Sequence, residues 1–296
     1  TKQLSKYEKI QIVNNYMLPE ILKSVGFTKE DVILKDEDLI YIINIYTNEA
    51  GVRKLKEKLF EIIREINLQY LMGDLTEFPF VITRKLIDNL FKDKFKINLK
   101  KIEKTSKVGL VNGLYATASG LGGITIIETT TFLSENKLKL ELTGQQGKVM
   151  KESMSVAKTV AWNLLTETQK EEIEKKKAFG IHIHCPEAAT PKDGPSAGAA
   201  ITLAIYSLLT NKKINNLYAI TGEIDLNGKI LAIGGLPLKV EGAKTAGVKT
   251  VLCPKENKDD LLKIRNNKHC PEDENFKIVM VEHISEVIDL MIVKEN

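Results

Sequence analysis

The chain has 296 residues, enough for one large domain or two of ordinary size. Hydrophobic residues make up 43% and charged residues 28%, a balance that supports a packed core and excludes disordered, collagen-like and coiled-coil proteins. The formal net charge of +4 is too small for a dedicated nucleic-acid binder, and no apolar run is long enough to insert into a membrane.

Two features concern where the protein works and whether the sequence is whole. The three cysteines, an odd number, form no disulfide framework, which predicts a reducing compartment. The chain opens Thr1-Lys2-Gln3, without Met and without a signal peptide. We therefore expect a piece that was processed or cut from a longer protein.

The first hundred residues have a helical pattern. In the segment from Glu49 to Met72, apolar residues recur every three or four positions, and Gly73 follows where a helix would end. Thr83 is a plausible N-cap for a further short helix. The remaining expected helices are Leu4 to Asn15, Pro19 to Ser24 and Asp36 to Tyr46. Residues 1–104 are thus predicted to form a small all-α domain.

Residues 105–296 alternate between short strands and helices, separated by glycines. The expected strands are Ile124 to Leu133, Lys137 to Leu142, Phe179 to His184, Leu217 to Thr221, Lys229 to Ile233 and Thr250 to Cys253. The expected helices are Gly147 to Leu165, Ala197 to Leu209 and Pro237 to Ala246, and two further elements, Lys277 to Val281 and Ile284 to Ile292, close the chain. This alternation predicts an α/β domain with mixed sheets and flanking helices, so the whole chain is of the α+β class.

A polar loop with three prolines leads into a helix of very small residues, and Ser196 lies at the start of that helix. Pro195 suits the first position of a helix, and the unpaired backbone N–H groups there can stabilise an oxyanion. Gly194, Ala197 and Gly198 leave room for a substrate backbone. Ser196 is therefore a candidate nucleophile, although serine is also a common helix cap and local chemistry alone leaves both roles open.

A serine nucleophile needs a base, and the sequence offers two kinds. His182 and His184 lie two apart on an expected strand, so they share one face, as a Ser-His-Asp hydrolase could use; two histidines satisfied by hydrogen bonds are the simpler interpretation. Lys239 follows the apolar run 230–238 and falls in the first turn of a helix, two features that depress the pKa of a lysine. Its alternative is a lysine that snorkels to solvent at a helix start.

The sequence around these candidates resembles the Lon proteases. Residues 190–198, TPKDGPSAG, resemble the catalytic-serine motif of that family, and residues 221–223 with 234–239 resemble its catalytic-lysine segment. Pro237 and Leu238 stand where family members usually have a short polar or charged stretch. Residues 144–153 and 182–187 match the helix start and the strand that precede the serine motif.

This resemblance covers essentially the whole chain and implies a Ser-Lys dyad, with Ser196 as nucleophile and Lys239 as base. It also implies that Thr221 orients the lysine amine. Asp193 and Glu187 are candidates to shape or gate the entrance to the site. Gly194 and Ala197 flank the nucleophile, and no metal site is expected.

The helical part resembles the small lid domain of the Lon AAA+ ATPase module. Residues 46–55, YTNEAGVRKL, match its sensor-2 segment, in which the arginine equivalent to Arg53 reaches the nucleotide phosphates. An ion pair with Glu49 or Glu57, each four residues away, is the alternative role for Arg53. No Gly-x4-Gly-Lys-Ser/Thr loop occurs, so we expect a C-terminal fragment with a lid at 1–104 and a proteolytic domain at 105–296.

The function implied by the resemblance is an ATP-dependent serine endopeptidase that degrades unfolded or damaged proteins. The full-length protein is expected to bind ATP and Mg²⁺ and to form a homo-hexamer, whereas the fragment needs no cofactor. Weak DNA binding is a further expectation, and the compartment is the bacterial cytoplasm or the mitochondrial matrix. The alternatives are a Ser-His-Asp hydrolase and a non-catalytic oligomerisation or nucleic-acid-binding module.

Overall fold

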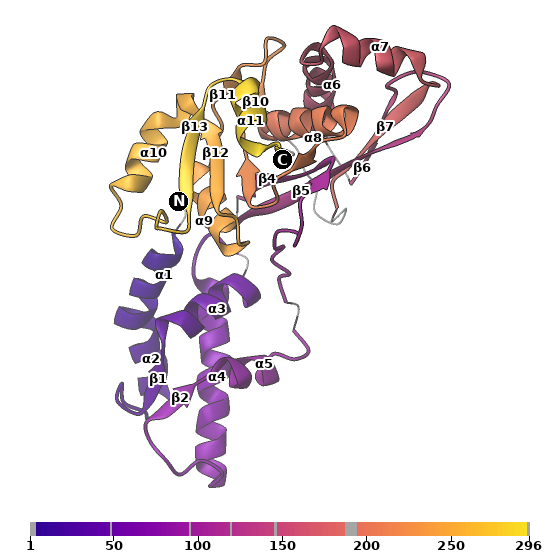
Figure 1. Ribbon diagram of the computed structural model, residues 1–296. Helices are drawn as coiled ribbons and strands as arrows, with labels where there is room; N and C mark the ends of the chain where they lie inside the picture. Colours follow the sequence, from indigo (N-terminus) through magenta and orange to yellow (C-terminus); the bar gives the residue numbers. More distant parts are fainter. Residues whose placement is uncertain are drawn as a thin grey trace. The chain divides into compact units, whose positions relative to one another are not determined.

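The computed structural model describes residues 4–47, 49–94, 96–118, 120–144, 147–186 and 194–294 (Figure 1). They form two compact units. The helical unit comprises the chain up to residue 99 together with 117–121, and the sheet unit comprises 100–116 and the chain from 122 onward. The domain boundary expected after residue 104 stays a prediction. No helix in the described ranges is both long and apolar enough to cross a membrane.

The helical unit starts with α1 (Lys6–Ile12), one π-helical turn (Val13–Met17) and α2 (Leu18–Ser24), which follow one another directly. Then come α3 (Asp36–Tyr46), with the predicted bounds, and α4 (Arg53–Met72), which ends at Gly73 with a φ of 82°. Helix α4 starts four residues later than predicted. The carboxylate of Glu49 accepts the backbone N–H groups of Lys54 and Leu55, at 2.9 and 2.8 Å, and so caps the helix from outside it.

A short parallel strand pair accompanies these helices. Strands β1 (Val32–Leu34) and β2 (Phe80–Ile82) pair directly before α5 (Arg84–Leu90), which Thr83 caps as predicted through a 3.4 Å bond from the Leu86 N–H. The helical character of this region is therefore confirmed, and the strand pair is an addition that the sequence did not reveal. Three-residue strands are too short to show an alternating pattern.

The sheet unit is built on a mixed seven-stranded sheet in the order β13-β12-β9-β4-β5-β7-β6. Strand β5 pairs antiparallel with β4 and β7, and the other neighbours in the sheet pair in parallel. The strands are β4 (Leu110–Ala116), β5 (Gly122–Leu133), β6 (Leu140–Thr143), β7 (Phe179–His184), β9 (Tyr218–Ile220), β12 (Thr250–Pro254) and β13 (Lys277–Val281).

Two smaller antiparallel pairs complete the strands of this unit. One joins β3 (Lys107–Val108) to β8 (Lys213–Ile214), and the other joins β10 (Glu223–Ile224) to β11 (Ile230–Leu231). The second pair is a hairpin whose connecting segment contains Asn227 and Gly228.

Helices cover both faces of the large sheet (Figure 1). Ile127 packs with α6, α8 and α11 in one core, whereas its neighbour Ile126 packs with α9 and α10 in the other, as expected for side chains that alternate along a strand. The helices are α6 (Lys148–Asn163), α7 (Glu167–Lys175), α8 (Gly198–Thr210), α9 (Leu236–Thr245), α10 (Lys258–Arg265) and α11 (Ile284–Met291). The predicted α+β class is confirmed.

Candidate active site

Ser196 lies in a single 3₁₀ turn, Pro195–Ala197, that leads directly into α8. Gly194 precedes this turn with a φ of 131°, a conformation that residues with a Cβ rarely adopt, although the space beside it is open. The backbone path therefore requires glycine at this position. It presents Ser196, which is partly exposed, at the entrance to the helix.

The backbone of Ser196 is fixed by the residues that follow β9. Its carbonyl oxygen accepts the Thr221 hydroxyl at 3.3 Å and the Gly222 N–H at 2.9 Å. In return, the N–H of Ala199 donates to the Gly222 carbonyl at 3.0 Å. These bonds tie the first turn of α8 to the end of β9, so the serine cannot shift without breaking them.

Lys239 is brought to the same place by α9. It is the fourth residue of that helix, it is 4% exposed, and its Nζ lies 3.0 Å from Thr221 Oγ1. The hydroxyl of Thr221 donates its single proton to the Ser196 carbonyl, so the amine is the donor in its bond to Thr221. The structure thus joins Ser196 and Lys239 through the fully buried Thr221.

The setting of Lys239 disfavours its charged form. Burial lowers the pKa of Lys239 from 10.5 to about 8. Its place in the first turn of α9 acts in the same direction, because the N-terminal end of a helix is positive. A neutral amine that donates one N–H to Thr221 keeps its lone pair free to accept a proton.

Glycines that were not predicted as site residues place α9 against the sheet. A Cβ on Gly122, at the start of β5, would lie 1.8 Å from the carbonyl oxygen of Leu238. A Cβ on Gly242 would lie 2.2 Å from the Gly122 carbonyl carbon. Only glycine allows helix and strand to approach this closely. In the sequence, the available signal is that Leu238 and Gly242 lie four apart, on one face of the predicted helix.

A second support comes from α6. A Cβ on Gly198 would lie 2.9 Å from Ser153 Oγ, and the Ser153 hydroxyl donates to the Pro195 carbonyl at 3.4 Å. Ser153 is buried and belongs to α6. The small residue at 198 therefore allows α6 to hold the turn that carries Ser196.

The two strand histidines meet at a different hydroxyl. Thr143 Oγ1 lies 2.8 Å from Nε2 of His182 and 2.7 Å from Nδ1 of His184. One hydroxyl proton can serve only one ring, so at least one of the two imidazoles donates to the threonine oxygen. This arrangement supports the simpler interpretation, in which both rings are satisfied by hydrogen bonds on the strand.

The remaining residues predicted to contribute to function are Asp193, Glu187 and Arg53. Asp193 and Glu187 lie outside the described residues. Arg53 is on the surface of the helical unit, with its side chain 92% exposed, and pairs with Glu57 at 3.4 Å; the Glu49 carboxylate instead caps α4. Within the described part of the chain, no group of three or more His, Cys, Asp or Glu side chains is arranged to hold a metal ion.

Two known protein domain families together match most of the chain. Residues 81–294 match the Lon protease C-terminal proteolytic domain, and residues 23–78 match the Lon protease AAA+ ATPase lid domain. The first of these matches includes Ser196, Thr221 and Lys239.

Individual proteins give the same result. A Lon protease of Clostridioides difficile is 38% identical over 98% of this chain and 36% of its own length. A Lon protease of Fusobacterium nucleatum is 41% identical over 87% of this chain and 33% of its own length, and a Lon protease homolog of Acanthamoeba polyphaga mimivirus is 36% identical over 95% and 33%. The chain spans about a third of the length of these relatives, and it belongs to the Lon protease family.

Proposed function

We propose that Ser196 and Lys239 form a catalytic dyad that hydrolyses peptide bonds. The observation that carries this proposal is the Lys239 amine, which is buried and held by the same Thr221 hydroxyl that bonds to the Ser196 carbonyl. Membership of the Lon protease family supports a peptide as the substrate. The lowered pKa of Lys239 gives it the property that a general base needs near neutral pH.

In the acylation step, the neutral Lys239 amine takes the proton of the Ser196 hydroxyl while Oγ attacks the carbonyl carbon of the scissile peptide. The negative charge that develops on the substrate oxygen is stabilised by backbone N–H groups around Ser196, in the turn before α8. The Lys239 ammonium then gives its proton to the leaving nitrogen as the C–N bond breaks. The product of this half-reaction is an ester between Ser196 and the acyl part of the substrate.

In the deacylation step, Lys239 takes a proton from a water molecule, whose oxygen attacks the ester carbonyl. Breaking the ester bond releases a carboxylic acid, which loses its proton to solvent, and the Lys239 ammonium returns its proton to the Ser196 oxygen. Thr221 serves both steps as a positioning residue, because it accepts an N–H of the amine and leaves the lone pair free. With a pKa of about 8, roughly one Lys239 in ten is neutral at pH 7, so the rate should rise through pH 8.

For the full-length protein, we propose ATP-dependent degradation of unfolded proteins by a homo-hexamer. The match to an AAA+ ATPase lid supports a nucleotide-driven motor, and the exposed Arg53 is available to reach nucleotide phosphates from a neighbouring ATPase core. This sequence itself contains no phosphate-binding Gly-x4-Gly-Lys-Ser/Thr loop. The chain alone should cleave small or unfolded peptides slowly, and ATP should not stimulate it.

The dyad can be tested by cleavage of a fluorogenic peptide and by labelling with a fluorophosphonate, followed by peptide mapping. We expect Ser196→Ala and Lys239→Ala each to lower cleavage by about a thousandfold or more, and Ser196 to be the labelled residue. His184→Ala is the control and should keep its activity.

Three outcomes would contradict the proposal in different ways. Robust cleavage by Lys239→Ala would exclude lysine as the base. Loss of activity in His184→Ala, with a rate controlled near the pKa of imidazole, would favour a Ser-His-Asp hydrolase. Salt-dependent DNA binding by a wild-type chain without peptidase activity would favour the non-catalytic alternative.

A further inference from the structure

Asn257 is a buried polar residue whose side chain does not serve its own helix. It ends the 3₁₀ turn Lys255–Asn257 after β12, occupies the N-cap position of α10, and is 4% exposed. Asparagine is among the preferred N-cap residues because its side chain can accept a backbone N–H of the first helical turn. Here no such bond forms, and the side chain points to a different segment.

That segment is the backbone of Ile233. Asn257 makes hydrogen bonds to both the N–H and the carbonyl group of Ile233. The Ile233 N–H donates to Asn257 Oδ1 at 3.0 Å, and Asn257 Nδ2 donates to the Ile233 carbonyl at 2.8 Å. The second proton of Nδ2 goes to Asp260 Oδ2 at 2.9 Å. The side-chain amide therefore acts like a neighbouring strand, and Asp260 fixes its orientation.

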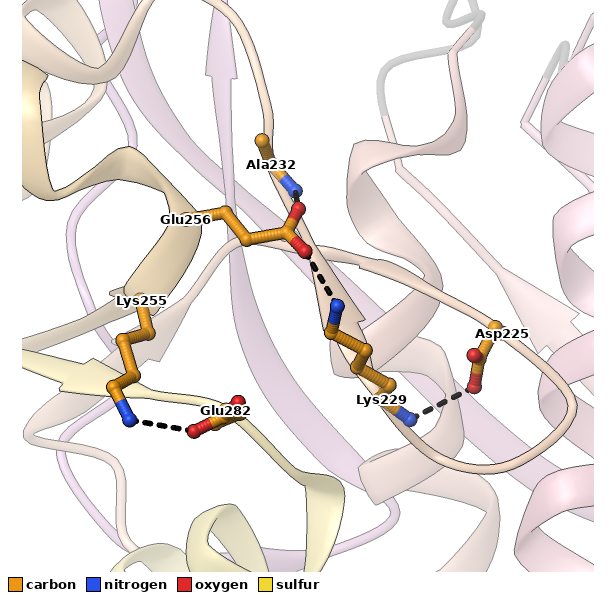
Figure 2. Close-up of polar contacts among 6 residues, drawn as sticks. All are labelled: Asp225, Lys229, Ala232, Lys255, Glu256 and Glu282. Carbon is orange, nitrogen blue, oxygen red and sulfur yellow. Dashed lines mark hydrogen bonds and ion pairs between the residues drawn. The ribbon is translucent and has the colours of Figure 1, made fainter.

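Glu256, which precedes Asn257, makes a hydrogen bond to the backbone of Ala232, which precedes Ile233. The Glu256 carboxylate accepts the N–H of Ala232 at 3.0 Å and pairs with the Lys229 amine at 2.7 Å. Figure 2 shows this carboxylate between the two nitrogens, with Asp225 bonded to the Lys229 backbone at 2.9 Å. In the same view, Lys255 reaches Glu282 at 2.6 Å, which connects the turn to the end of β13.

Ala232 and Ile233, to which Glu256 and Asn257 bond, lie just before the start of α9. Gly234 and Gly235 follow Ile233, and Gly235, with a φ of 72°, forms the N-cap of the helix. The Gly235 carbonyl accepts the N–H of Lys239 at 3.1 Å. Two successive glycines have much conformational freedom, so the direction of the first turn depends on what anchors the chain just before them as well as on the contact of α9 with Gly122.

We propose that Asn257, assisted by Glu256, is a positioning residue for the Lys239 amine. Its two hydrogen bonds to the Ile233 backbone fix the direction of the first turn of α9, and this turn holds the amine within hydrogen-bond distance of the Thr221 hydroxyl. The catalytic consequence rests on the proposed Ser-Lys dyad. The charged groups along this path are Glu256 with Lys229, and Asp260. None of them causes the low pKa of Lys239, which comes from burial.

The test uses the whole chain and two measurements on each variant. The pH dependence of peptide cleavage reports on the base, and competitive acetylation across pH, followed by mapping of the peptide that carries Lys239, reports the pKa of its amine without requiring activity. Asn257→Ala should lower cleavage by about tenfold to a hundredfold at pH 7.5. It should also move the pKa of Lys239 from about 8 toward 10.5, with partial recovery of cleavage at higher pH.

Asn112→Ala is the matched control. Asn112 is also buried, at 2% exposed, and donates to the backbone carbonyls of Asn216 and Tyr218 at 2.9 Å each, so its loss removes two bonds of the same kind. It should lower stability and leave the pKa of Lys239 unchanged. Glu256→Ala, at an exposed residue, should shift cleavage in the direction of Asn257→Ala by about threefold, and it tests the proposal should Asn257→Ala not fold.

The proposal is overturned if Asn257→Ala lowers cleavage equally at every pH with the pKa of Lys239 unchanged, or if Asn112→Ala shifts that pKa as strongly. Wild-type behaviour of both Asn257→Ala and Glu256→Ala would also overturn it. Absence of cleavage by the wild-type chain would instead refute the proposed dyad. The acetylation measurement would then still report whether Asn257 positions the amine.

Discussion

Each unit of the protein buries one lysine among its described residues, and comparing the two separates burial from function. Lys9 in α1 is 5% exposed and Lys239 in α9 is 4% exposed. The Lys9 amine donates to the backbone carbonyl of Glu49 at 2.6 Å, whereas the Lys239 amine donates to the Thr221 hydroxyl at 3.0 Å.

The partners give the two amines different chemistry. Burial lowers the pKa of both lysines, but the nearby charge of Glu49 acts against that change for Lys9. For Lys239 burial is the cause of the shift, and the pKa falls to about 8. The hydrogen bond of Lys9 to the Glu49 carbonyl links α1 to the segment before α4. Burial alone does not make a lysine a base, since the groups that face the amine decide whether it keeps its proton.

The largest expected effect comes from replacing each lysine by methionine, which has a similar length and no amine. Lys239→Met should lower peptide cleavage by about a thousandfold or more, while stability stays the same or rises because no ammonium has to be buried. Lys9→Met should leave cleavage unchanged and lower the free energy of unfolding by about 1–3 kcal/mol, because the Glu49 carbonyl loses its donor. Fluorogenic peptide assays and urea denaturation measure the two effects.

This comparison fails if the two substitutions exchange their effects. Loss of cleavage in Lys9→Met would mean that the helical unit contributes to catalysis through this amine. A marked loss of stability in Lys239→Met would mean that the charged amine stabilises the fold and does not act as a neutral base.

The second prediction concerns pH and the stability of the sheet unit. Below pH 8 both the folded and the unfolded chain carry the Lys239 proton, so folding buries an ammonium at full cost. Between pH 8 and 10.5 the unfolded chain still binds that proton and the folded chain does not, so raising the pH favours folding. The free energy of unfolding of the wild type, minus that of Lys239→Met, should rise by roughly 3 kcal/mol over this range.

Urea denaturation of the two proteins between pH 7 and 10.5 gives this difference, and subtracting the variant removes the titration of the other lysines. A difference that is flat with pH would show that the folded amine has an ordinary pKa. The same subtraction with Lys9→Met should change less, because Glu49 opposes the effect of burial at Lys9.

A smaller effect is expected from the hydroxyl that holds the base. Thr221→Val keeps the side-chain shape and removes the group that accepts the Lys239 amine, so cleavage should fall about tenfold to a hundredfold. Thr47→Val is its counterpart in the helical unit, where a buried hydroxyl donates to the Ile43 carbonyl at 2.9 Å, and it should not change cleavage. Equal activity of Thr221→Val and wild type would remove Thr221 from the mechanism.

The fold could be predicted where the sequence pattern was long or had clear ends. Helix α3 and strand β7 have the predicted bounds, and Thr83 and Gly73 mark helix ends as expected. Helix α4 starts later than predicted because the Glu49 carboxylate caps it from just before its first residue, and such a cap leaves no periodic signal. Short polar helices such as α7 were missed, since one buried residue, Ile173, gives no apolar stripe.

The residues of the candidate site likewise fall into those that sequence motifs predict and those that they do not. The motifs named Ser196, Lys239 and Thr221, and the structure joins the three through the Thr221 hydroxyl. The supporting residues could not be found from sequence because their roles depend on contacts between distant segments. Gly122 contacts Leu238 in this way, and Asn257 contacts Ile233. An asparagine before a helix predicts a cap, and only the three-dimensional structure shows that its amide is used elsewhere.

The smallest expected effect tests how the Glu49 carboxylate influences the pKa of Lys9. Glu49 accepts the Lys9 amine with its backbone carbonyl, and its carboxylate caps α4 at Lys54 and Leu55. Glu49→Gln keeps the carbonyl and removes the charge, so the pKa of Lys9 should fall further, and the cap should weaken by about 0.5–1 kcal/mol. Competitive acetylation and urea denaturation measure these two changes, and peptide cleavage should stay at the wild-type level. An unchanged pKa of Lys9 would show that the Glu49 carboxylate does not oppose the effect of burial; a lower pKa would show that one nearby negative charge raises the pKa of a buried lysine.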